Sequence, residues 1–206
     1  MKAGGMRSDG ARLLLAAIAV ALAGACVSTP ETDLYTLDMA SSGAAEPGVN
    51  VKVEPLGAVD PLERPELLVQ ATPTRLEYYA VDQWAGDLGD LVRRKLEAEL
   101  GPPVEGRPEY TVFGTVLSFQ EVDGTRPKAL AEIHLGVRDD EALRYEEPIF
   151  EATYRVERPL EEAGADGLVR ALSRAVEEIA AEFASDLAEH HAARDAEVSG
   201  GRSGAP

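Results

Sequence analysis

Cysteine is nearly absent from this sequence of 206 residues, which contains a single one, Cys26. A single cysteine excludes an internal disulfide. Basic residues are also few, because Lys and Arg number 20 against 37 Asp and Glu, giving a formal net charge of −17 at pH 7. Such a chain repels phosphate backbones, so nucleic-acid binding is not expected. It also repels anionic lipid headgroups unless a covalent bond holds it to the membrane.

The sequence has no long hydrophobic run. Its most apolar stretch is residues 13–25, which follow the basic residues Lys2, Arg7 and Arg12. This stretch is too short to span a bilayer as a helix, but it has the length of the hydrophobic region of a signal peptide. We therefore predict that residues 1–25 are a signal peptide.

Small residues and then a cysteine end the apolar run, as Ala23-Gly24-Ala25-Cys26. This pattern is typical of a bacterial lipobox, although Ala23 stands where leucine is usual. Cys26 would receive a diacylglycerol, and cleavage after Ala25 would make it the N-terminus, ready for a third acyl chain such as palmitate. Each buried CH₂ contributes about 0.8 kcal/mol to such an anchor. The alternative is an ordinary secretory signal, with Cys26 as an incidental free thiol. Val27 after the cysteine favours the outer membrane.

Composition divides the remaining chain into three parts. Residues 26–48 are predicted to be the lipidated N-terminus and a flexible linker, because residues 40–48 are mostly Ala, Ser, Gly and Pro. Residues 49–192 are predicted to form one domain. Residues 193–206 end in Ser, Gly and Pro and are predicted to be a disordered tail.

Apolar and polar residues alternate in several segments of the domain, which predicts strands. The segments are 49–54, 67–71, 75–81, 110–122, 128–138 and 150–157. In 110–122, the pattern predicts that Phe113, Leu117 and Phe119 share a face. Short turns between the last three segments predict an antiparallel meander, and residues 67–81 read as a hairpin.

Two segments change to a helical period. One starts with Asp87 as the N-cap and ends at Gly101-Pro102. Its outer face is predicted to carry Arg93, Arg94, Glu97 and Glu99. The other begins near Asp166 and frays around His190 and His191. The simplest burial of all apolar faces is an α+β fold, a mostly antiparallel sheet of five to six strands with two amphipathic helices packed on one face.

No group of residues predicts catalysis, so we expect no enzyme, no metal and no cofactor. His134, His190 and His191 lack neighbours at metal-ligand spacing. The pairs Glu146-Glu147 and Glu161-Glu162 are adjacent, so their carboxylates point apart. No nucleophile motif surrounds Ser118 or Ser173, and no Walker loop is present.

Several short motifs carry a resemblance to a known family. They are Leu34-Tyr35-Thr36-Leu37, Val53-Glu54-Pro55-Leu56, Arg64-Pro65-Glu66-Leu67-Leu68-Val69 and Trp84-Ala85-x-x-Leu88. In these motifs and in the order of its elements, the chain resembles the ABC-type transport auxiliary lipoprotein family. The resemblance implies a lipidated cysteine before the first motif.

The resemblance also implies a non-enzymatic role in the periplasm, at the outer membrane. The chain would bind and tether an MCE-domain protein and ABC transporter subunits that move lipids, with a homo-oligomeric ring as one form of assembly. Trp84 and Arg64 are the candidate partner-binding residues. The alternatives are a packing role for Trp84 and a chain turn at Arg64-Pro65. An envelope assembly or structural lipoprotein without a transport partner is the alternative function.

Overall fold

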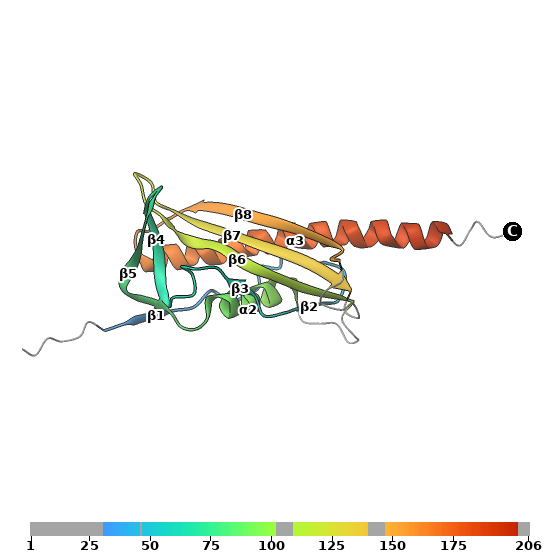
Figure 1. Ribbon diagram of the computed structural model, residues 1–206, viewed down its shortest axis with the longest axis horizontal. Coiled ribbons are helices and arrows are strands. Elements are labelled where there is room, and N and C mark those ends of the chain that lie inside the picture. The colour runs from blue at the N-terminus through green and yellow to red at the C-terminus, as the bar shows by residue number, and fades with distance from the viewer. Residues whose placement is uncertain (1–30, 46, 102–108, 140–146, 202–206) are drawn as a thin grey trace, which may run out of the picture. The chain divides into compact units, whose positions relative to one another are not determined.

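The computed structural model describes the backbone of residues 31–45, 47–101, 109–139 and 147–201. The predicted signal peptide, Ala25 and Cys26 lie outside these ranges. Among the described residues, no helix is both long enough and apolar enough to cross a membrane. Ten elements follow one another in these ranges (Figure 1): β1 (Asp33–Tyr35), β2 (Val51–Val53), β3 (Gly57–Ala58), β4 (Glu66–Thr72), β5 (Arg75–Trp84), α2 (Leu88–Leu100), β6 (Tyr110–Val122), β7 (Lys128–Asp139), β8 (Phe150–Pro159) and α3 (Ala165–Gly201).

The eight described strands belong to one mixed sheet with the order β1-β5-β4-β6-β7-β8. One edge of β6 pairs with antiparallel β7 along its whole length. The other edge pairs in succession with β2, β3 and β4, each of which runs parallel to β6. Strand β1 lies at the border of the sheet, parallel to β5.

The predicted α+β class is confirmed. Strands β6, β7 and β8 form the expected antiparallel meander, and β4 and β5 form the expected hairpin. The sheet has more strands than the five to six predicted, because β1 and β3 are three and two residues long. Segments that short cannot show an alternating pattern. Their parallel pairing depends on distant partners and not on a local turn.

A bulge in β6 separates two phenylalanines that the alternation placed together. The register with β7 shifts at Leu117. Phe113 lies opposite Gly136, whereas Phe119 lies opposite Ala131 and is buried. Neighbouring residues of a strand point to opposite faces, and the extra residue of a bulge reverses that alternation. The prediction that Phe113, Leu117 and Phe119 share one face is therefore wrong.

Both helices cover the same face of the sheet (Figure 1). Helix α2 contacts β2 and β3, α3 contacts β6, β7 and β8, and the two helices also contact each other. Helix α2 begins as predicted, because the Asp87 carboxylate accepts a hydrogen bond of 3.0 Å from the backbone N–H of Asp90. After α2, Gly101 adopts φ 84°, a conformation that favours glycine. The core lies between these two layers.

Helix α3 begins one residue before the predicted start at Asp166, but it does not fray around His190 and His191. It continues to Gly201, so residues 193–201 of the segment predicted as a disordered tail are helical. Residues 202–206 of that segment lie outside the described residues.

Contacts with the sheet explain why α3 continues. The ring of His190 stacks on Phe150, with ring centroids 4.5 Å apart. Nδ1 of His191 lies 2.8 Å from the hydroxyl oxygen of Tyr110. One turn further on, Arg194 forms an ion pair of 2.7 Å with the last residue of β7. A pattern of apolar spacing does not reveal such polar and aromatic contacts.

Candidate functional site

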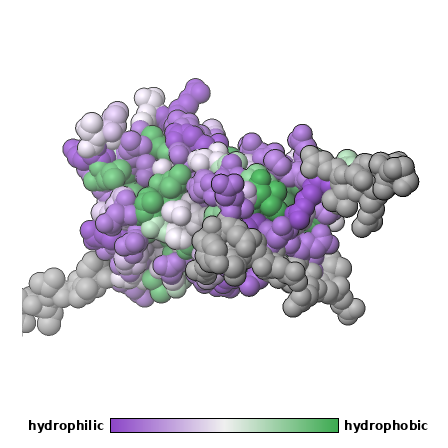
Figure 2. Space-filling model, turned by 45° about the vertical axis from the view of Figure 1, so that its right-hand side comes forward, coloured by the Kyte–Doolittle hydropathy of each residue, from purple (hydrophilic) through white to green (hydrophobic). Residues whose placement is uncertain are grey.

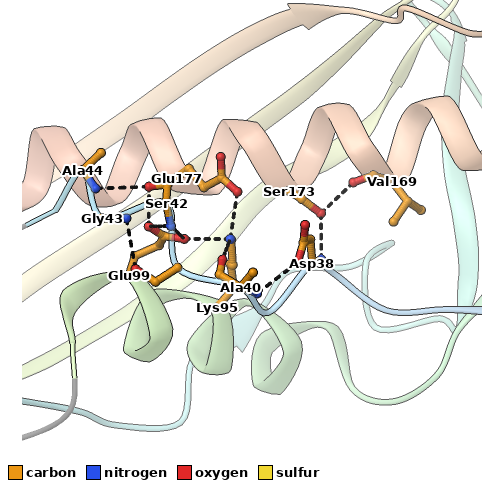
Figure 3. A network of polar contacts seen from close by, with 11 residues as sticks. Asp38, Ala40, Ser42, Gly43, Ala44, Lys95, Glu99, Val169, Ser173 and Glu177 are labelled. Carbon is orange, nitrogen blue, oxygen red and sulfur yellow. Dashed lines mark hydrogen bonds and ion pairs between the residues drawn. The ribbon is translucent and has the colours of Figure 1, made fainter.

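The N-terminal part of the described chain is docked on the two helices. After β1, residues 36–45 run between α2 and α3 (Figure 3). We call these residues the N-terminal strap. Leu37 and Ala45 of the strap are buried in the core. The interpretation of residues 40–48 as a flexible linker is therefore wrong for residues 40–45, which side chains of both helices hold in place.

The ammonium group of Lys95, on α2, lies at the centre of these contacts (Figure 3). Its Nζ is 2.7 Å from the backbone oxygen of Ala40, 2.7 Å from Oε1 of Glu99 and 2.8 Å from Oε1 of Glu177. A lysine ammonium carries three donors, so each donor has a partner. Lys95 is 0% exposed, and a charge that is buried without partners costs far more than it can contribute. The strap therefore completes the surroundings of a buried charge.

Glu99 holds the strap through a serine. The backbone N–H of Ser42 donates to both carboxylate oxygens of Glu99, at 3.1 and 3.0 Å, and its hydroxyl donates to one of them at 2.6 Å. Burial alone would raise the pKa of Glu99. Hydrogen bonds from Lys95 and Ser42 outweigh burial and leave that pKa lowered. Burial likewise opposes the charge of Lys95, but hydrogen bonds with Glu177 and Glu99 leave its pKa raised. Both groups are therefore charged at neutral pH.

A second contact fixes the strap on α3. The backbone N–H of Asp38 donates to Oγ of Ser173 at 3.0 Å, and the Ser173 hydroxyl donates to the backbone oxygen of Val169 at 2.8 Å (Figure 3). Ser173 is buried and acts as a relay between the strap and the helix backbone. These hydrogen bonds join the strap to α2 and α3, and they attach the strap to the domain.

Chain length limits how far the predicted lipidation site can lie from the strap. Cys26 is outside the described residues, but only seven peptide units separate it from Asp33, where β1 begins. A fully extended chain spans at most about 3.6 Å per residue, so this connection reaches about 25 Å.

Trp84 is placed in the core at the end of β5. Its side chain is 5% exposed, and its ring centroid is 5.6 Å from that of Phe119. The backbone of Trp84 is paired with Tyr35 of β1, directly before the strap. Burial favours the packing role among the two alternatives, and the indole can contact a partner only if neighbouring side chains move.

Arg64 lies at the surface, next to the hairpin formed by β4 and β5. Its guanidinium group stacks on the ring of Tyr78, 4.2 Å from the centroid, and two of its nitrogens are 3.2 Å from the oxygens of Glu66. The hydroxyl of Tyr78 donates to the backbone oxygen of Pro61 at 3.3 Å. The side chain is exposed, yet these contacts hold it in one orientation. Such a group is suited to binding a carboxylate of a partner.

The remaining sequence candidates do not come together. His134 lies on β7 with its Nδ1 3.3 Å from the hydroxyl of Thr153. Glu161 and Glu162 pair with different arginines. Glu146 lies outside the described residues, and so does the end of the turn after β7. Among the residues that the structure describes, no three His, Cys, Asp or Glu side chains are grouped as metal ligands.

Sequence reasoning missed Lys95, Ser42 and the burial of Glu99. The helical pattern placed Glu99 on the outer face of α2, which is wrong, because its side chain is 2% exposed. A signal was present: Lys95 and Glu99 are seven residues after Leu88 and Val92, on the apolar stripe. A charged pair at such positions indicates a buried ion pair or a polar contact across the helix interface.

The fold and the site define a two-layer α+β domain with its N-terminal strap clamped between its helices. Solved structures share this fold. A protein from Xanthomonas campestris, described as a member of the DUF330 family, has a TM-score of 0.65 and 17% sequence identity, and the match covers 80% of this chain and 99% of that one. An uncharacterized protein has a TM-score of 0.60 and 15% identity, covering 77% and 99%. No curated protein matches the sequence.

The sequence matches the family described as ABC-type transport auxiliary lipoprotein component over residues 35–184. That match covers most of the chain, which therefore belongs to this family. It includes the last residue of β1, the strap, all of α2 and α3 as far as residue 184, so the family domain begins before residue 49, where the sequence pattern placed its start. Membership makes the chain an auxiliary lipoprotein of ABC-type transport, held at a membrane of the cell envelope.

Proposed function

We propose that the protein is anchored through a lipid on Cys26, faces the periplasm from the outer membrane, and serves an ABC/MCE-type lipid transport system by binding and tethering. The observation that supports it most directly is the clamped strap. A lipid anchor can hold a domain in a defined place only if the chain between them is short and firmly attached. Here that connection is at most about 25 Å long and ends in a strap tied to both helices.

The proposed role is one of binding without catalysis. The polar contacts around Lys95 attach the strap to both helices. Arg64 lies at the surface, where a partner can reach its guanidinium group beside Glu66. The partners we propose are an MCE-domain protein and ABC transporter subunits, with the auxiliary protein docking as a single chain or as a homo-oligomeric ring. ATP hydrolysis then belongs to another subunit.

Pull-down from detergent-solubilised envelopes, with mass spectrometry, tests the partners. The expected result is recovery of a permease, an ATPase or an MCE-domain protein, together with genes for them beside this one. Arg64→Ala should weaken the recovery, whereas Arg94→Ala, an exposed arginine on α2, should not. If no transport subunit is recovered or encoded nearby, the transport role is wrong and a structural envelope lipoprotein remains.

Cys26→Ala tests the anchor separately. The variant should leave the membrane fraction, and the wild-type protein should show the mass of attached acyl chains. A variant that still fractionates wholly with membranes would show that something other than a lipid on Cys26 holds the protein there.

A further inference from the structure

Three arginines line one surface pocket at the start of α3. Arg158 is near the end of β8, and Arg170 and Arg174 are one turn apart on α3. Gly167 lines the same pocket, and a Cβ there would come within 1.7 Å of the backbone oxygen of Glu162. The loop before α3 is therefore packed directly on the first turn of the helix. This gathers three guanidinium groups in one place on a chain with few basic residues.

Within the part of the chain that the structure describes, each of these arginines forms an ion pair with an exposed carboxylate. Arg158 is 3.0 Å from Glu178, and the other two pair with Glu162 and Glu161. The side chains of these three glutamates are between 53% and 69% exposed. Exposed ion pairs contribute only about 0–1 kcal/mol each, so a phosphate can replace the carboxylates at small cost. Guanidinium groups bind phosphate oxygens in pairs with matched geometry.

The start of α3, which lines the pocket, lies at the same end of the described domain as β1 (Figure 1). Ser173 directly precedes one of the arginines and holds the strap through the N–H of Asp38. Burial raises the pKa of Tyr35 in β1. The negative charge of Asp166, in the first turn of α3, is close enough to raise that pKa further. Helix α3 runs from this end to the opposite end of the sheet (Figure 1).

We propose that Arg158, Arg170 and Arg174 bind the phosphates of lipid headgroups in the membrane that holds Cys26. The inference rests on the proposed lipid anchor and adds an orientation to it: the start of α3 faces the bilayer, and the far end of the helix points away. Acidic residues near β1 and the net charge of the chain disfavour anionic lipids. The partner is therefore a zwitterionic headgroup, whose phosphate is presented without a net surface charge.

Apolar contacts with the bilayer are a weaker basis for orientation. The large hydrophobic side chains exposed among the described residues are Leu34 and Leu76, which lie on different strands. On the side shown in Figure 2, hydrophobic residues form separate areas between hydrophilic ones. The arginine pocket instead offers three guanidinium groups within one site, beside the carboxylate of Glu161.

Fluorescence resonance energy transfer from a dye on the protein to a labelled lipid in the bilayer tests this orientation. The lipidated full chain is reconstituted into phosphatidylcholine vesicles that contain an acceptor-labelled lipid. Donor dyes are attached at Ala163→Cys, beside the pocket, or at Ala193→Cys, about 40 Å along the helix. Labelling is specific because the single native cysteine is occupied by its diacylglycerol. Transfer should be high from position 163 and low from position 193.

Substitution of the three arginines decides whether they cause the orientation. With Arg158→Gln, Arg170→Gln and Arg174→Gln combined, transfer from position 163 should fall toward the value at position 193. The same loss of three positive charges away from the pocket, with Arg93→Gln, Arg94→Gln and Arg155→Gln, should leave the transfer from position 163 unchanged. Vesicles of digalactosyldiacylglycerol, which has no phosphate, should give the triple variant's result with the wild-type protein.

Two results overturn the proposal while leaving the anchor intact. The first is equal transfer from the wild-type protein and the pocket variant on phosphatidylcholine, and the second is unchanged orientation on the phosphate-free lipid. Loss of transport subunits from a pull-down with the pocket variant, without a change in transfer, would assign the arginines to a protein partner instead. If the wild-type chain does not float with vesicles and its Cys26 reacts with the dye, the anchor itself is wrong and this inference falls with it.

Discussion

Replacing Lys95 with methionine should detach the N-terminal strap. The change removes the ammonium group but keeps most of the side-chain volume, so it leaves Glu99 buried at 2% exposure without its counter-charge. Removing one partner of a buried ion pair typically costs about 3–5 kcal/mol. For a domain of this size, that loss corresponds to a decrease in Tm of about 6–20 °C. The strap should also lose the hydrogen bond that Ala40 accepts.

Urea unfolding and amide hydrogen exchange measure the two effects. The free energy of unfolding should fall by about 3–5 kcal/mol. The amide of Ser42 should exchange faster, because its N–H donates to Glu99. Lys128→Met is the matched control, since Lys128 pairs with Glu157 at the surface. Loss of an exposed pair should change stability by about 1 kcal/mol or less.

A second substitution separates the buried charge from the loss of packing. Lys95→Met combined with Glu99→Leu should recover part of the stability, because no uncompensated carboxylate remains. The reasoning is refuted if Lys95→Met behaves like Lys128→Met and the Ser42 amide keeps its protection. That outcome would mean that water reaches the network or that the strap is held by its apolar residues.

Three further predictions concern other parts of the fold. The pKa of Glu99 is lowered from its ordinary 4.5. Its contribution to the free energy of unfolding is therefore present above pH 4.5 and is lost as the pH falls through the folded pKa. Urea unfolding from about pH 6 to about pH 3 should show a larger loss of stability in the wild type than in Glu99→Gln. Gly136→Ala should destabilise by about 1–3 kcal/mol, because the new Cβ would lie 2.4 Å from the ring of Phe113; an unchanged thermal midpoint would contradict this. Tyr110→Phe should cost about 0.5–1.5 kcal/mol and speed amide exchange after His191, since it removes the hydrogen bond to His191, one of the contacts that hold the end of α3 to the sheet.

Local patterns in the sequence determined much of the fold. The meander of β6, β7 and β8 was predictable because each strand is long enough for alternation and the turns are short. The start of α2 was predictable because the Asp87 cap acts on an N–H only three residues away. The motifs between Leu34 and Leu88 indicated the family, which the match over residues 35–184 confirmed. The signal peptide and the lipidation of Cys26 stay predictions.

Tertiary structure decided what depends on residues far apart in the chain. The bulge at Leu117 places Phe113 and Phe119 on opposite faces of β6, although the sequence around it reads as a regular strand. Lys95 is buried because partners from the strap, 55 residues before it, and from α3, 82 residues after it, meet at its ammonium group. A helical pattern records only near neighbours, so it cannot show whether a charge on the apolar stripe has distant partners. For the same physical reason, the sequence of residues 40–45 resembles a flexible linker, because the helices that hold it in place are distant in the chain.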